Sequence, residues 1–252
     1  MKFDYPAPEQ IPALRSLWKT AFGDGDAFLD LFFSSAYTPR RCRCAVEDDR
    51  VAAALYWFDV SWNDCRCAYI YAVATDPRYR GRGICRKLMA DTAALLKGNG
   101  YQGILLVPQE EGLFSMYAKM GYLPGSSLDE FHCAASEHTV PIREITAAEY
   151  AAHRRISLPP GGVIQEGENL TFLAGIARFY RGDGFLAAVS REEAHLRILE
   201  YLGDPDQIAP LVAALGRREA TVRTPGSSKA FSMYLPLTTE CPKPEYFAFC
   251  FD

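Results

Sequence analysis

The stretch Val73–Leu88, VATDPRYRGRGICRKL, decides the fold of this chain. It begins as the end of an apolar strand, turns at Asp76-Pro77 and continues as the start of a helix. Glycines at positions 81 and 83 allow a tight turn and a close approach of the backbone to a ligand. A helix that starts here presents unpaired N–H groups and the positive end of its dipole. The stretch therefore predicts an anion site, suited to phosphate or pyrophosphate, at a strand-to-helix junction.

Basic side chains surround this turn. Five of the ten residues from 78 to 87 are Arg or Lys, in a chain whose formal net charge is -4. The sequence excludes two familiar phosphate-binding loops. A dinucleotide-binding loop needs glycine where Arg86 stands, and the G-x4-G-K-[ST] pattern of a P-loop is absent. The alternative without a ligand is a solvated basic turn with a glycine cap.

The junction resembles the signature of the GNAT acetyltransferase superfamily, [QR]-x-x-G-x-[GA], which Arg78 to Gly83 match. The resemblance covers roughly residues 1–135. It includes residues 105–122, LLVPQEEGLFSMYAKMGY, which look like the superfamily's passage from its fifth strand to its fourth helix. It implies an α/β (α+β) fold with a mixed, mostly antiparallel sheet flanked by helices. The element order of the second half, given below, adds a second, smaller GNAT-like unit.

The resemblance also implies acetyl-CoA as the acyl donor, held in a gap between the splayed strands Cys65–Thr75 and Gly103–Val107. The end of the first strand would pair its backbone with the pantetheine arm, and the loop after it would cradle the pyrophosphate. These contacts fall on Val73, Ala74, Thr75, Arg80, Gly81, Arg82, Gly83, Ile84, Cys85 and Arg86.

Tyr117 matches the superfamily's tyrosine beside the thioester sulfur. A phenol with an unperturbed pKa near 10 stays protonated at neutral pH. It can donate a proton or hydrogen bond to the thiolate that leaves. The alternative is a core tyrosine on a short amphipathic helix.

The sequence leaves the general base open. Some superfamily members carry a glutamate on the fourth strand, but residues 69–72 here are Tyr-Ile-Tyr-Ala. Two pairs of carboxylates are candidates, Glu110 with Glu111 and Asp24 with Asp26. The alternative for the first pair is a solvated loop, and for the second a turn and a helix N-cap. The third candidate is the terminal carboxylate at Asp252, after an expected strand at Tyr246–Phe251 that alternatively completes a sheet.

Hydrophobic periodicity predicts two units of similar element order. The first, residues 1–137, is the catalytic domain, with helices at Ile11–Ala21, Asp26–Ser34, Ile84–Lys97 and Leu113–Met120 and a hairpin of Cys42–Glu47 with Val51–Ser61. The second, residues 138–252, is a degenerate GNAT-like domain without the phosphate loop. Its expected elements are Thr139–Ile145, Ala147–Arg155, a helix at Ile164–Phe179, strands Phe185–Ser190 and His195–Leu202, a helix at Pro205–Leu215 and a strand at Ala220–Thr224.

Composition limits the function classes. The chain has 252 residues, 49% of them hydrophobic, so it is long and apolar enough for a sizeable core. The pI near 5.7 argues against a dedicated nucleic-acid binder. No run is long enough for a membrane helix and the start does not read as a signal peptide, so we expect a cytoplasmic protein without nucleic-acid or membrane partners.

Cysteine and histidine spacing predicts no metal site. The eight cysteines include the pairs Cys42/Cys44 and Cys65/Cys67, on strands that a third strand would separate by about 9–10 Å. That is too far for shared ligands of one metal, so we expect reduced structural thiols. The four histidines show no metal spacing and are expected to be structural or surface residues.

The expected function is an N-acetyltransferase. It would move acetyl from acetyl-CoA to a primary amine of a small molecule or peptide by direct attack in a ternary complex. Two alternatives stay open, a non-catalytic acyl-CoA-binding module and a structural or interaction module, and a longer acyl group is not distinguished. The acceptor and the oligomeric state are not determined by the sequence.

Overall fold

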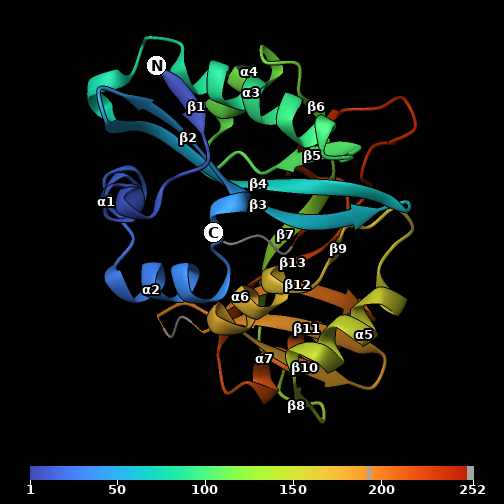
Figure 1. The fold of residues 1–252 in the computed structure, drawn as a ribbon. Helices are drawn as coiled ribbons and strands as arrows, with labels where there is room; N and C mark the ends of the chain where they lie inside the picture. Colours follow the sequence, from blue (N-terminus) through green and yellow to red (C-terminus); the bar gives the residue numbers. More distant parts are fainter. Residues whose placement is uncertain (192–193, 249–252) are drawn as a thin grey trace. The chain divides into compact units, whose positions relative to one another are not determined.

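A computed structural model describes residues 1–191 and 194–248, and the chain divides into two compact units. Unit 1 consists of residues 1–106, 110–123 and 233–242. Unit 2 consists of residues 107–109, 124–232 and the described residues from 243 onward. Each unit packs helices against one mixed, mostly antiparallel sheet (Figure 1), which confirms the predicted fold class.

The sheet of unit 1 has the order β1-β2-β3-β4-β5-β15-β6. Its strands are β1 (Lys2–Asp4), β2 (Cys42–Glu47), β3 (Arg50–Trp62), β4 (Cys65–Thr75), β5 (Gly103–Leu106), β15 (Met233–Pro236) and β6 (Leu123–Pro124). β4 and β5 pair in parallel, whereas β1 to β4 and the pair β15–β5 are antiparallel. The hairpins turn at residues 48–49 and 63–64, where Asp and Asn adopt the positive φ that such tight turns require.

Helices cover both faces of this sheet. α1 (Ile11–Phe22) and α2 (Asp26–Ser35) lie on one face, and α3 (Ile84–Gly98) and α4 (Glu111–Ala118) on the other (Figure 1). Apolar residues at helical spacing explain α1, which buries Leu14, Leu17 and Trp18. All four helices agree with the predicted ones to within two residues at each end.

Unit 2 has a sheet of order β14-β7-β13-β12-β11-β10-β8. Its strands are β14 (Lys229–Ala230), β7 (Ser127–Ala134), β13 (Glu219–Pro225), β12 (Arg197–Gly203), β11 (Phe185–Ser190), β10 (Ala177–Gly182) and β8 (Arg143–Ile145). Its other elements are α5 (Ala147–Ser157), α6 (Glu168–Ile176), α7 (Ile208–Ala214), the short strand β9 (Ile164–Gln165) and the 3-10 turn Pro205–Gln207.

The two units repeat one order of elements. Unit 1 runs strand, two helices, three antiparallel strands, a 3-10 turn, a helix and a parallel strand, ending at β5. Unit 2 runs through the same series from β8 to β13, and its parallel pair is β12 with β13. The second unit therefore repeats the element order of the first, as predicted.

Two expected elements in the second half were wrong or incomplete. The helix predicted at Ile164–Phe179 is instead β9, α6 and β10, because residues 177–182 pair with all of β11 through a turn at Gly184. The strand expected at Tyr246–Phe251 is reduced in its described part to a single bridge between Tyr246 and Gly162. Residues 249–251 lie outside the described part.

The chain crosses between the sheets, so the units do not follow the expected division at residue 137. β7 pairs with β13 over seven residues in unit 2, and β15 returns from the C-terminal half to pair with β5 in unit 1. Where the crossing segments meet, the hydroxyls of Ser126 and Ser232 lie 2.7 Å apart. A Cβ on Gly125 would lie 2.5 Å from the Ser232 hydroxyl, so only glycine fits there.

Candidate active site

The end of β4 carries a bulge that the sequence did not signal. Ala53 and Ala54 pair with Thr75 and Ala74, but the next pair is Tyr56 with Tyr71, so β4 has one residue more than β3 in this interval. The extra length is absorbed by Ala72, whose φ is +49°. An L-residue rarely adopts this conformation, and such bulges re-aim the strand that follows.

β4 and β5 separate next to this bulge. They pair in parallel only from Cys67–Tyr69 to Gly103–Leu105. Beyond that point β4 continues to Thr75 without a partner on β5, which ends at Leu106. Among the described residues, β4 therefore has no β5 partner over the stretch expected to meet the pantetheine arm.

The loop after β4 is shaped by Asp76 and two glycines. The Asp76 carboxylate accepts from the backbone N–H of Arg78 at 2.9 Å and from its guanidinium at 2.7 Å. These hydrogen bonds hold the pKa of Asp76 below its ordinary value. Gly81 and Gly83 have φ of +76° and +72°, and a Cβ on either would meet nothing within 4 Å. Glycine is therefore required here by backbone conformation and not by crowding.

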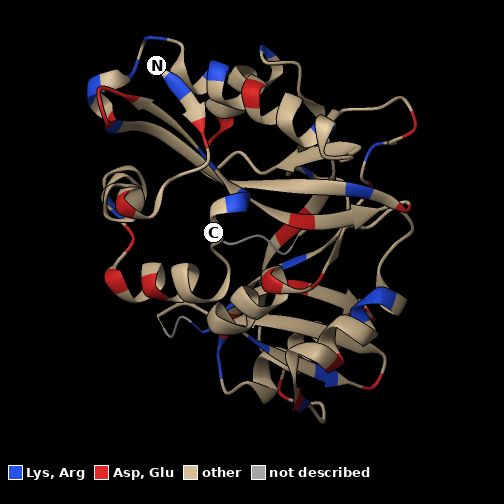
Figure 2. Cartoon of the chain, in the orientation of Figure 1, with Lys and Arg blue, Asp and Glu red and all other residues tan. Residues whose placement is uncertain are grey.

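The N-terminus of α3 opens directly on this loop. Gly83 caps the helix without a side-chain hydrogen bond, so the first-turn N–H groups have no capping partner. Arg80, Arg82 and Arg86 are exposed around it, and arginines colour the loop blue in Figure 2. Arg80 donates to the Thr75 carbonyl at 3.2 Å. Of the basic residues predicted to surround an anion, Arg78 is paired with Asp76 at 2.7 Å, and Arg82 makes a longer ion pair with Glu47 at 3.7 Å.

Tyr117 lies on α4 and packs into the same hydrophobic cluster as Ile84, with Val73 and Cys85 at its edge. The structure thus places Tyr117 in the same core cluster as the first residue of α3. Only 6% of the residue is exposed, and burial, with a smaller effect of Cys85, raises the pKa of its phenol well above the ordinary value. Its hydroxyl makes no hydrogen bond to any described residue, so it is available to a ligand.

The carboxylates considered as general bases lie near α1 and at the start of α4, and two of them already have partners. Asp24 accepts a 2.7 Å hydrogen bond from the indole of Trp18. Asp26 pairs with Lys19, which lowers its pKa and makes it a weaker base. Glu110 is the N-cap position of α4 and Glu111 lies in its first turn. Asp252 lies outside the described residues.

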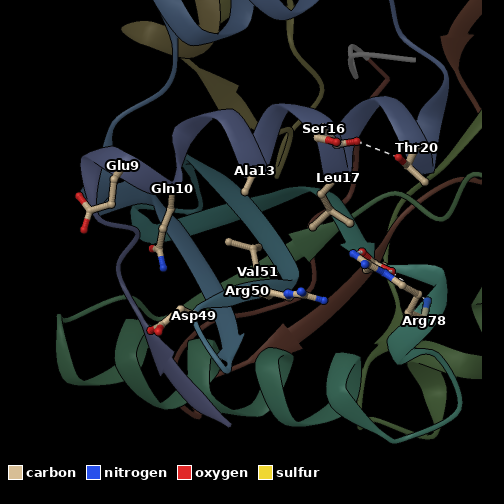
Figure 3. Close-up of a pocket in the computed structure, with 11 residues that line it drawn as sticks. Glu9, Gln10, Ala13, Ser16, Leu17, Thr20, Asp49, Arg50, Val51 and Arg78 are labelled. Atoms are coloured by element: carbon tan, nitrogen blue, oxygen red, sulfur yellow. Dashed lines mark hydrogen bonds and ion pairs between the residues drawn. The ribbon is translucent and has the colours of Figure 1, made fainter.

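A polar groove of about 540 Å³ runs along α1 in unit 1 (Figure 3). One face of α1, from Ala13 to Thr20, forms one wall together with Glu9 and Gln10 of the 3-10 turn before it. The turn at Asp49-Arg50 with Asp76 and Arg78 forms the other wall. Within the described chain, Glu9, Asp49 and Arg50 take part in no ion pair. The groove therefore offers unpaired charges of both signs next to the end of β4.

In the part of the chain that the structure describes, the thiols and imidazoles do not gather into a metal site. No group of three or more His, Cys, Asp or Glu among the described residues could hold a metal ion. Cys42 and Cys44 on β2 and Cys65 and Cys67 on β4 are buried and free, with β3 between them as predicted. His195 and His132 share the hydroxyl of Thr221, at 2.8 and 3.4 Å. None of the described helices is long and apolar enough to cross a membrane.

Comparison with known proteins agrees with this geometry. Residues 3–125 match the profile of the acetyltransferase (GNAT) domain family, so this part of the chain belongs to the GNAT acetyltransferases. No curated protein matches the sequence.

Similar solved structures extend over both units. A GCN5-related N-acetyltransferase from Kribbella flavida is 18% identical, with a TM-score of 0.71 over 92% of this chain and 70% of its own. A GCN5-related N-acetyltransferase from Anabaena variabilis is 15% identical, with a TM-score of 0.75 over 94% and 73%. Eis1 from Mycobacterium abscessus is 11% identical, with a TM-score of 0.66 over 94% and 74%. At these identities the similarity shows a shared two-unit fold.

Proposed function

We propose that unit 1 transfers the acetyl group of acetyl-CoA to a primary amine. The observation that carries this proposal is the junction between β4 and α3. There an uncapped helix N-terminus, two left-handed glycines and exposed arginines adjoin the unpaired end of β4. A helix terminus of this kind binds phosphate groups, and a free strand end binds an extended amide chain.

Each part of the donor then has a place on the chain. The pyrophosphate lies against the loop from Arg80 to Arg86, including Gly81, Gly83, Ile84 and Cys85. The two amides of the pantetheine arm pair with the backbone of Val73, Ala74 and Thr75. The bulge at Ala72 aims this backbone into the gap between β4 and β5.

The chemistry is an aminolysis of a thioester. The neutral amine attacks the carbonyl carbon, and the new C–N bond forms as the carbonyl becomes an oxyanion. The C–S bond then breaks, and the thiolate takes a proton from the phenol of Tyr117. The amine nitrogen loses one proton to water or to a base, and the phenolate of Tyr117 regains one from water, which restores the charge balance. Holding amine and thioester together supplies much of the acceleration.

The groove along α1 supports a polar amine acceptor. It lies on the α1–α2 side of the sheet, and its unpaired Glu9 and Asp49 carboxylates suit an ammonium group before deprotonation. Along α1 its lining runs from Ala13 to Thr20, about 11 Å at 1.5 Å per residue, and continues through Gln10 and Glu9, which suits a peptide or an extended small molecule.

A second candidate function is acyl-CoA binding without turnover. It is favoured by one observation, the lack of a carboxylate on β4 at residues 69–72. The two functions share the donor site and differ only in whether bound acetyl-CoA is consumed.

Replacing Tyr117 by phenylalanine tests the transfer. We expect kcat for thiol release from acetyl-CoA, measured with a panel of amines, to fall about 10²-fold or more, because a general acid contributes on this scale. The KM for acetyl-CoA should stay within a few-fold, since the ring remains.

Tyr122→Phe is the matched control. Tyr122 packs 5.7 Å from Tyr117 between ring centroids, and its hydroxyl is buried without a hydrogen-bond partner. Its removal should leave kcat unchanged. Equal losses in both variants would show that Tyr117 is structural, and no turnover by the wild type with any amine would favour the binding module.

A further inference from the structure

Unit 2 holds a second hollow at the point that corresponds to the donor gap of unit 1. Its parallel strands β12 and β13 pair only at Arg197–Ile198 with Thr221–Val222. Both continue without pairing to each other, β12 to Gly203 along β11 and β13 to Pro225 along β7. The two central strands therefore separate toward their C-terminal ends, as β4 and β5 do.

A cavity of about 410 Å³ occupies this separation. Leu202 and Gly203 line it from β12, Thr224 from β13, Ile208 from α7 and Phe131 from β7. Such a volume falls within the range of small-molecule sites. Phe131 is 39% exposed, which is unusual for a large apolar side chain in this chain. An apolar wall is thus open to solvent at the cavity.

The walls of the cavity are fixed by close contacts. The Tyr201 hydroxyl donates to the Asp204 carbonyl at 2.5 Å and holds the end of β12. A Cβ on Gly203 would lie 2.2 Å from the Gly184 carbonyl oxygen, so β12 and the β10–β11 turn approach closely there. The cavity is therefore preformed, which lowers the cost of binding.

The charges at this cavity exclude the donor of unit 1. Among the described residues, its lining contains the carboxylate of Asp129 and no basic side chain. Asp129 accepts from the backbone N–H groups of Ser227 and Ser228 at 3.0 and 2.9 Å, which lowers its pKa and keeps it ionised. Where unit 1 has its arginine–glycine loop, unit 2 has Asp204-Pro205-Asp206. A phosphate group would be repelled.

We propose that this cavity of unit 2 binds a small organic cation with an apolar body, such as an aryl-alkylamine. The apolar body would pack on Phe131, Leu202 and Ile208, and the ammonium group would face Asp129. The inference does not rest on acetyl transfer by unit 1, and binding here would give the second unit a ligand of its own.

Amide chemical shifts of the full chain, followed by two-dimensional NMR during titration with phenethylamine, test the proposal. We expect saturable shifts at Leu202, Gly203 and Ile208. Phenylacetate, which has the same ring and the opposite charge, should bind at least tenfold more weakly. Thr224→Trp, which fills the cavity, should abolish the shifts, and Thr139→Trp, at an exposed position of unit 2 outside the lining, should keep them.

Three results would overturn the proposal: equal binding of the amine and the acid, shifts confined to unit 1, or shifts that persist in a folded Thr224→Trp variant. If Thr224→Trp does not fold, Phe131→Ala replaces it. Because Phe131 is partly exposed, this variant should fold and should weaken phenethylamine binding several-fold, and unchanged binding would likewise contradict the proposal.

Discussion

Tyr117 shows how burial prepares a side chain for a chemical role. Its ring packs with Ile84 and Tyr122, which removes the phenol from water and raises its pKa. The protonated form is therefore the one that the fold favours. The contribution of the protonated phenol to the free energy of unfolding is complete below the unperturbed pKa near 10. It is lost only as the pH rises through the higher pKa of the folded state.

The raised pKa of Tyr117 determines the expected pH dependence of turnover. In the wild type, kcat should rise or stay level from pH 7 to about pH 10, because the acceptor amine loses its proton while Tyr117 keeps its own. A pH–rate profile with saturating acetyl-CoA checks this. A decline centred below about pH 9 that Tyr117→Phe abolishes would contradict the high pKa of the phenol.

Single residues also mark the limit of sequence reasoning. Tyr117 and the ten donor-site residues could be proposed because they stand at fixed positions around an arginine–glycine signature. The bulge at Ala72 could not be proposed, because alanine has no preference for positive φ and no residue pattern in the sequence indicates a bulge there. Likewise, the pairing of Arg78 with Asp76 depends on the turn geometry that only the structure displays.

Among the elements, β4 carries the most function, and its bulge is open to test. Ala72→Val should destabilise the protein by about 1–3 kcal/mol, because a β-branched residue is strained at this φ, and should raise the KM for acetyl-CoA. Ala72→Gly should be at least as stable as the wild type. Urea unfolding of the three proteins checks the order, and a Val variant as stable as the wild type would show that the strain is absent.

The predicted helices and strands match the structure where the local hydrophobic pattern and the tertiary pairing favour the same element. α1 to α4 and β2 to β4 have clear periodicity and turn residues at both ends, and their bounds were predicted closely. β10 was read as helix because its apolar run fits either period, and its pairing with β11 decides the outcome. Short edge strands such as β1 and β14 carry too few residues for any pattern.

For the whole molecule, the exchange of strands between units matters most. A chain of residues 1–137 contains the full donor signature but lacks β15, which buries Met233 beside β5, and leaves β7 without its partner β13. We therefore expect this fragment to show no cooperative thermal transition, because an unpaired β5 exposes core and backbone groups.

A matched chain restores the missing strand. Residues 1–125 joined by a short Gly/Ser linker to residues 232–242 should recover a cooperative transition in circular dichroism, because β15 can again pair with β5. Cooperative unfolding of residues 1–137 alone would show that the exchanged strand is dispensable, and would support a division of the chain at that residue.

The central claim is that the β4–α3 junction binds acetyl-CoA, and calorimetric titration of acetyl-CoA tests it most directly. Gly83→Glu places a carboxylate where the pyrophosphate should lie, and Gly98→Glu adds the same charge at the other end of α3, also in open space. We predict micromolar binding to the wild type and to Gly98→Glu, and a loss of at least 100-fold in Gly83→Glu. Equal affinity of the two variants, or no binding to folded wild type, would contradict the account.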